Sequence, residues 1–219
     1  MDLQRMQERV GLYSLLRTLY VYPLQEAVLD AVAHLELPDA SPLHPGLHEM
    51  QARLRADGAR AAALDALNIE MTRLLEGPGL TPAPPYASYY LHRGQLMGPP
   101  AIAARHAYLE WQAIPAGPTH LPEDHVALEL GFLAYLAELS VRAGAVAQKA
   151  LYASRTFLRQ QLLPWLARFC TALSSAAADP FFRGLARFTQ AAVEADLAWL
   201  DEALADLPVE TTDATSTCC

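Results

Sequence analysis

The sequence lacks the long apolar segments that carry a protein into or across a membrane. No stretch of the 219 residues approaches the roughly 20 consecutive apolar residues needed to span a bilayer, because charges or prolines interrupt every run. The amino terminus, MDLQRMQER, is polar and has neither the apolar core nor the small-residue cleavage site of a secretory signal. We therefore expect a soluble, cytoplasmic protein without stable membrane insertion.

Cysteine is scarce, which argues against a disulfide framework and against a zinc site. Of three cysteines, Cys170 lies in an apolar helical pattern, and Cys218 and Cys219 end a tail rich in Thr and Ser. His120 and His125 are not accompanied by the further His, Cys or carboxylate ligands that a metal site needs. The sequence is consistent with a reducing compartment, and we expect neither a bound metal nor a cofactor.

Basic residues are outnumbered, which argues against binding to nucleic acid. The chain has 16 Lys and Arg against 24 Asp and Glu, a net charge of -8, and no basic stripe that would attract a phosphate backbone. Glycine-rich nucleotide-binding motifs are absent, and Ser88 lacks the small neighbours of a nucleophile elbow. We therefore expect no nucleic-acid partner and no catalytic residues of these kinds.

The composition and length predict one all-helical domain. The chain is 53% apolar, with Ala and Leu dominant and few β-branched runs, which favours helix. We expect a single globular multi-helix bundle over residues 1–207, with a Pro-rich loop between an N-terminal and a C-terminal helical half. Residues 208–219 offer too little apolar surface to offset the entropy of ordering, so we expect a disordered tail.

Apolar residues that recur at three- and four-residue steps predict a series of amphipathic helices. Pro122 suits a first helical turn, and Glu123 and Asp124 follow it where the helix dipole is positive. This helix is apolar on most faces, so it should be central in the bundle. Pro164 is expected to kink or split a later helix. The predicted helical ranges are 3–20, 24–35, 47–54, 59–76, 102–112, 121–136, 146–173 and 179–204.

Asp124, His125 and Glu129 are the residues that most resemble acid/base machinery, because a carboxylate can orient an imidazole. On a helix, His125 and Glu129 share a face, whereas Asp124 and His125 point about 100° apart. The alternative is structural: the acids serve the helix dipole, and His125 packs partly buried. The nearby tyrosines, likewise, can form a recognition surface or simply pack.

Several motifs in a fixed order resemble the TorD/DmsD/NarJ family of redox-enzyme maturation chaperones. The main one is Pro122–His125, which opens the apolar helix; Tyr86–Tyr89 and the pair Arg105 and Tyr108 lie upstream. The resemblance covers roughly residues 12–204. The chain departs from the usual family run at Leu121 and Gly131, where members often carry Glu, and at Leu74-Leu75 in place of Leu-Phe. Downstream, Phe157, Leu162–Trp165 and Phe181-Phe182 complete the order.

The resemblance implies an all-helical chaperone, not an enzyme, that binds the twin-arginine leader of a molybdopterin oxidoreductase subunit. Such proteins hold back export and assist cofactor insertion. The leader's arginines are expected to pair first with Asp124 and second with Glu129, while His125 orients the site or reads a backbone carbonyl. The apolar part of the leader is expected to lie on Met71, Leu74, Leu75, Tyr86, Tyr90 and Tyr108, and Ser88, Tyr89, Arg105 and Pro122 complete the predicted peptide-binding surface.

Two other functions compete with this interpretation. An enzyme would use His125 and Glu129 as acid and base, and this requires a pocket beside His125. A helical oligomerisation or regulatory module would have no leader-peptide groove and would use its exposed apolar surface for association. The sequence is consistent with either a monomer or a homodimer.

Overall fold

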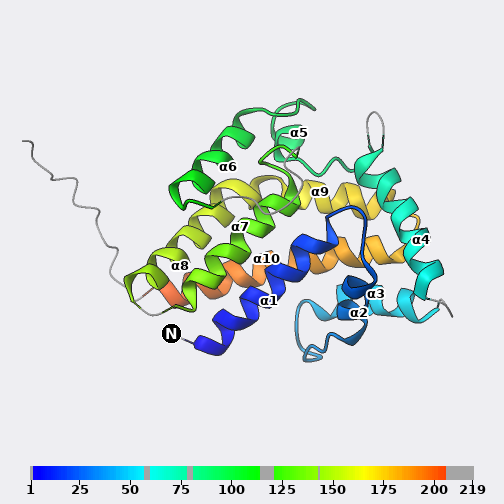
Figure 1. The fold of residues 1–219 in the computed structure, drawn as a ribbon, viewed down its shortest axis with the longest axis horizontal. Helices are drawn as coiled ribbons and strands as arrows, with labels where there is room; N and C mark the ends of the chain where they lie inside the picture. The colour runs from blue at the N-terminus through cyan, green and yellow to red at the C-terminus, as the bar shows by residue number, and fades with distance from the viewer. Residues whose placement is uncertain (1, 57–59, 78–80, 114–120, 143, 206–219) are drawn as a thin grey trace, which may run out of the picture.

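The structure, a computed structural model, describes residues 2–56, 60–77, 81–113, 121–142 and 144–205. These residues form an all-helical bundle (Figure 1), as predicted. No described helix is both long and apolar enough to cross a membrane. The elements are α1 (Leu3–Leu19), α2 (Glu26–His34), α3 (His44–Ala56), α4 (Arg60–Met71), the π-helical turn η1 (Thr72–Glu76), α5 (Ala87–Leu91), α6 (Pro99–Glu110), α7 (Val126–Ser140), α8 (Ala145–Phe157), the π-helical turn η2 (Leu158–Leu162), α9 (Leu163–Ala176) and α10 (Pro180–Leu204).

Helix α7 lies at the centre of the bundle, which confirms the prediction. It packs along α1 on one side and against α8 on another (Figure 1). Its residues are apolar around most of the circumference, so burial on several sides removes the most apolar surface from water. The position of α7 matters for the site, because the predicted binding residues Asp124 and His125 immediately precede it.

Helices α3 and α10 cross in close backbone contact. A Cβ atom added to Gly46 would lie 2.5 Å from the backbone nitrogen of Phe188, and one added to Gly184 would lie 2.7 Å from the carbonyl oxygen of Gly46. No side chain fits at either position, because the obstructing atoms belong to the backbone. These two glycines therefore set the distance between α3 and α10.

The kink or split expected at Pro164 corresponds to a π-helical turn that separates two α-helices. The helical run passes from α8 through η2 into α9, and Pro164 occupies the first turn of α9. Proline has no N–H to offer the preceding turn, and a π-helical turn is one way a helix accommodates that loss. The domain limits stay predictions, since the proposed tail, residues 208–219, lies outside the described residues.

The predicted start of the central helix is wrong by several residues. The expected first turn at Pro122–Asp124 is not helical, and α7 begins at Val126 with His125 as its N-cap. The cause is a tertiary contact: His125 pairs with Tyr86 in an isolated antiparallel bridge. The sequence pattern also missed α5, which contains part of the tyrosine cluster.

Candidate functional site

A short antiparallel contact joins the tyrosine segment to the start of α7. The N–H of Ala87 donates to the carbonyl oxygen of Asp124 at 3.1 Å, and the N–H of Val126 donates to the carbonyl oxygen of Pro85 at 2.9 Å. Because proline limits the conformations open to residues 82–85, this segment is stiff enough to act as a partner for the turn before α7. The predicted site residues Tyr86, Ser88, Asp124 and His125 are therefore brought together.

His125 caps helix α7 with its imidazole ring. Its Nδ1 accepts the N–H of Ala127 at 3.1 Å, so the neutral ring carries its hydrogen on Nε2. The residue is 1% exposed, and burial lowers the pKa of His125 to about 3. The Tyr86 ring meets it edge-on at 5.1 Å, and the nearest carboxylate oxygen, on Glu76, lies 3.9 Å from Nε2, beyond hydrogen-bond distance.

Asp124 fixes the connection between α5 and α6. Its Oδ2 accepts the N–H of Ser88 at 2.7 Å, and the Ser88 hydroxyl oxygen accepts the N–H of Gly98 at 2.9 Å. Tyr108 adds a tie from the far end of α6, since its hydroxyl donates to the carbonyl oxygen of Glu123 at 2.8 Å. Asp124 and Ser88 are both 0% exposed, so these bonds form a buried latch. We call the set Asp124, Ser88 and Gly98 the Asp124 latch.

Glu129 lies inside the protein, where its carboxyl group contacts the core rather than solvent. It is 0% exposed, and its Oε2 accepts the indole N–H of Trp165 at 3.2 Å. Burial, and then the charge of Asp124, raise the pKa of Glu129 well above that of a free carboxyl. In this position the carboxyl group packs in the bundle and accepts a hydrogen bond within it.

Replacing Glu129 with glutamine is expected to stabilise the protein at neutral and alkaline pH. The folded-state pKa of Glu129 lies above the unfolded value of about 4.3. The contribution of Glu129 to the unfolding free energy is therefore fully present below about pH 4.3 and is lost as the pH rises through the folded-state pKa. Glutamine keeps the acceptor for Trp165 and does not titrate. Urea midpoints at about pH 5 and about pH 8 measure the difference. Glu110→Gln, at an exposed position of α6, is the control. If both variants change the urea midpoint equally between the two pH values, the raised pKa of Glu129 would be contradicted.

The remaining predicted site residues face the core more than the solvent. Met71, Leu74, Leu75, Tyr90 and Tyr108 are all buried, and the Tyr90 ring stacks on Trp165 at 5.7 Å. Tyr86, Tyr89 and Pro122 are partly buried, and Arg105 is exposed. In this conformation the predicted set is therefore not an open surface, and neither Asp124 nor Glu129 presents its carboxylate to a ligand.

An apolar groove missed by the sequence analysis runs beside α7. Its volume is about 710 Å³, and it lies between the second half of α1, the segment after α1, the end of α6 and one face of α7. Small residues of α7 form its floor: Ala127, Gly131 and Ala134, at helical spacing. Tyr108 is the one predicted peptide-binding residue that also lines this groove. The stripe of small residues was a sequence signal that could have located the floor, although not the opposite wall.

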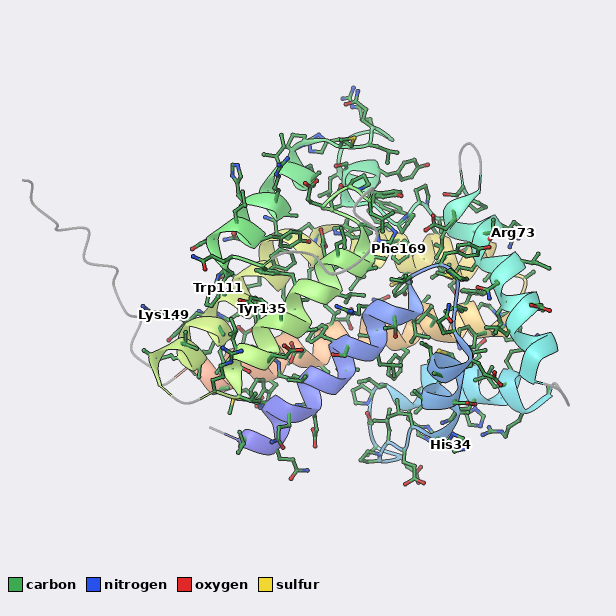
Figure 2. The ribbon with its side chains drawn as sticks, viewed as in Figure 1. His34, Arg73, Trp111, Tyr135, Lys149 and Phe169 are labelled. Atoms are coloured by element: carbon green, nitrogen blue, oxygen red, sulfur yellow. The ribbon has the colours of Figure 1, made fainter. Side chains whose placement is uncertain are left out.

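Polar groups mark the edges of the groove. Arg17 lies over the floor, since a Cβ atom on Gly131 would be 3.7 Å from its Cδ. Glu138 is exposed and, within the described part of the chain, has no ion-pair partner. Beside the groove the Tyr135 hydroxyl donates to the carbonyl oxygen of Trp111 at 3.2 Å, which ties α7 to the end of α6 (Figure 2). The described residues include no group of three or more His, Cys, Asp or Glu that could hold a metal ion.

The fold and the groove define a class: an all-helical protein with an apolar groove beside its central helix. The model of the family described as nitrate reductase delta subunit matches residues 38–171, more than half of the chain, so the protein belongs to that family. The TorD/DmsD/NarJ resemblance predicted from the ordered motifs is thereby confirmed.

Relatives and a solved structure agree with this assignment. The chaperone protein TorD of Vibrio cholerae serotype O1 is 34% identical over 120 residues, which is 54% of this chain and 54% of that protein, so the chain spans about half the length of this curated relative. The chaperone protein TorD of Aliivibrio salmonicida is 24% identical over 204 residues, covering 89% of this chain and 95% of that protein. A crystal structure described as that of a redox enzyme maturation protein from Archaeoglobus fulgidus superposes with a TM-score of 0.52 at 22% identity. The match covers 88% of this chain and 93% of that chain, and it supports the fold.

Proposed function

We propose that the protein is a cytoplasmic, system-specific chaperone that binds a molybdopterin oxidoreductase subunit through its twin-arginine leader. Holding the unfinished subunit would assist cofactor insertion before export. Family membership supports the chaperone class, and the apolar groove beside α7 is the observation that supports peptide binding. A leader contains an apolar stretch, and burial of that stretch is favourable by about 25 cal/mol per Å² of apolar surface.

The contacts of the leader are proposed at the groove rather than at the Asp124 latch. The apolar stretch would lie on the floor formed by Ala127, Gly131 and Ala134. An arginine of the leader would pair with Glu138, an exposed carboxylate at the groove edge. Asp124 acts indirectly in this proposal: it fixes the α5–α6 connection, and Tyr108 of α6 lines the groove. Direct contact between Asp124 and a leader arginine would require the latch to open.

Gly131→Leu is expected to weaken leader binding about tenfold or more, a loss of about 1.4 kcal/mol or more, by filling the floor of the groove. The substitution is tolerated by the fold, because the nearest atoms to an added Cβ are side-chain atoms of Arg17 at 3.7 and 3.8 Å. Loss of a helical glycine should even stabilise α7 by about 0.5–1 kcal/mol. Calorimetric titration with a synthetic twin-arginine leader of a molybdoenzyme measures the affinity.

Gly11→Leu is the matched control for this experiment. Gly11 is an exposed glycine within α1 with no atom within 4 Å of an added Cβ, so the same change raises helix propensity without touching the groove. We expect its affinity for the leader to equal that of the wild type. Equal binding by both variants would remove the groove from the proposal, and the absence of binding heat with wild-type protein would contradict the proposed function itself.

A further inference from the structure

The outer face of α6 and the connection before it expose large apolar side chains that the bundle does not use. Ile102 is 56% exposed and Leu109 is 65% exposed, one heptad apart on the same face of α6. The inward face of this helix carries the smaller Ala101 and Ala104. The helix thus places its larger aliphatic side chains in solvent and its smaller ones in the core.

The connection from α5 to α6 extends this apolar surface. Leu96 is 51% exposed and Met97 is 72% exposed, and the Asp124 latch holds the backbone beside them through Gly98. α5, α6 and their connection form the upper edge of the molecule in Figure 1, where α6 packs mainly against α5 and η2. We call this the α6 surface. It consists of Leu91, Arg93, Leu96, Met97, Ile102, Arg105, His106 and Leu109, all exposed.

The residues of the α6 surface include two arginines and no acid, although the chain as a whole is acidic; Glu110 and Glu123 lie at its border. The chain carries a net charge of -8, yet no Asp or Glu occurs between Glu76 and Glu110. Arg93 and Arg105 are exposed within that interval. The carboxylate paired with Arg105, on Glu123, is 3.7 Å away, and the Arg105 side chain remains 66% exposed. The α6 surface therefore combines apolar side chains with two exposed guanidinium groups, of which that of Arg105 also pairs with Glu123.

We propose that the α6 surface is a docking site for an acidic amphipathic segment of a partner protein, separate from the leader groove. Such a helix would pack its apolar stripe on Ile102 and Leu109, and its carboxylates would pair with Arg93 and Arg105. An acidic partner is attracted here and repelled by the acidic remainder of the chain, so charge selects this site over others.

Two other occupants fit the same surface less well. In a symmetric dimer through α6, the same patch would face itself and would bring Arg105 towards its own copy. An anionic membrane would gain about 1 kcal/mol for each of the two arginines, while the net charge of -8 opposes the approach of the whole protein. The acidic segment is therefore the occupant that the charges favour.

The test uses two labelled helical peptides with the same leucine stripe, one flanked by glutamates and the other by lysines, and measures fluorescence anisotropy at low salt. The wild-type protein is expected to bind the glutamate peptide at least about tenfold more tightly, with an affinity that falls as salt is added. Arg93→Glu with Arg105→Glu is expected to reverse the preference. Ile102→Gln with Leu109→Gln is expected to abolish binding of both peptides.

Ile69→Gln is the matched control, because Ile69 of α4 is 73% exposed and lies outside the α6 surface. It should bind like the wild type. Gly131→Leu should also bind the glutamate peptide, and the α6 variants should still bind the leader. Because the peptide assay does not use the leader, its result stands even if the wild-type protein binds no leader. Equal affinity for the two peptides, no binding, or equal loss in Ile69→Gln would overturn the proposal.

Two further measurements address the other occupants. Wild-type protein that co-sediments with vesicles of phosphatidylcholine and phosphatidylglycerol, while the Ile102→Gln, Leu109→Gln variant does not, would assign the surface to a membrane and overturn the proposal. Self-association in sedimentation that the same variant loses would assign it to a second copy and also overturn it. We expect the wild-type protein neither to co-sediment with the vesicles nor to self-associate through this surface, and to bind the glutamate peptide.

Discussion

Acidification from about pH 6.5 towards about pH 3 is expected to destabilise the wild-type protein, and His125→Asn is expected to remove most of that loss. The Nδ1 atom of His125 accepts the N–H of Ala127, so a second proton would break the N-cap bond and bury a charge. Burial lowers the pKa of His125 from about 6.5 in an unfolded chain to about 3. Stability is therefore present above about pH 6.5 and is lost as the pH falls, by on the order of 3–5 kcal/mol.

Urea unfolding at several pH values between about pH 8 and about pH 4 measures this effect. Asparagine keeps a side-chain acceptor for the cap but does not titrate. The control is His34→Asn, since His34 lies at the surface near the lower edge of the molecule in Figure 2. If the unfolding free energy of His125→Asn falls with pH as steeply as that of the wild type, protonation of His125 does not cause the acid destabilisation. That result would contradict the lowered pKa of His125.

The helices could be predicted from the sequence because each buries one face at a regular spacing. The apolar residues of α1 and α10 repeat every three or four positions, so their limits were predicted to within one residue. The start of α7 was not predictable in the same way. Pro122, Glu123 and Asp124 satisfy every local rule for a first helical turn. The N–H of Val126 instead donates to the carbonyl oxygen of Pro85, a partner that no local pattern reveals.

The sequence predicted which residues of the candidate site lie close together, but not the direction in which the Asp124 side chain points. The ordered motifs placed Ser88 and Asp124 in one site, and the structure joins them by a hydrogen bond of 2.7 Å. The expectation that Asp124 faces a ligand came from the family resemblance and from the pairing of arginine with carboxylates, whereas the structure buries this carboxylate, which accepts the N–H of Ser88. The groove depends on α1 approaching α7, and the spacing within either helix alone contains no information about that distance.

The contact between α1 and α10 leads to a stability prediction of the same size as that for His125. Arg9 donates from Nε to Asp196 Oδ1 at 2.6 Å, and the Tyr13 hydroxyl donates to Oδ2 of the same carboxylate at 2.7 Å. Arg9 and Asp196 are each 1% exposed. Arg9→Leu leaves the carboxylate with Tyr13 alone, and Asp196→Leu leaves a buried guanidinium without its counterion. Each single change is expected to cost about 3–5 kcal/mol.

The double variant, Arg9→Leu with Asp196→Leu, is expected to lose less stability than either single variant, because no uncompensated charge remains in the core. Arg159→Leu provides the control, since Arg159 donates to Asp201 at the same 2.6 Å but the two side chains are 56% and 36% exposed. Its loss should stay below about 1 kcal/mol. The comparison, measured by urea unfolding, separates burial from distance as the origin of the cost. A single Arg9→Leu loss no larger than that of Arg159→Leu would mean that the unpaired Asp196 finds water or a proton on folding, and burial would then not set the stability of the α1–α10 contact.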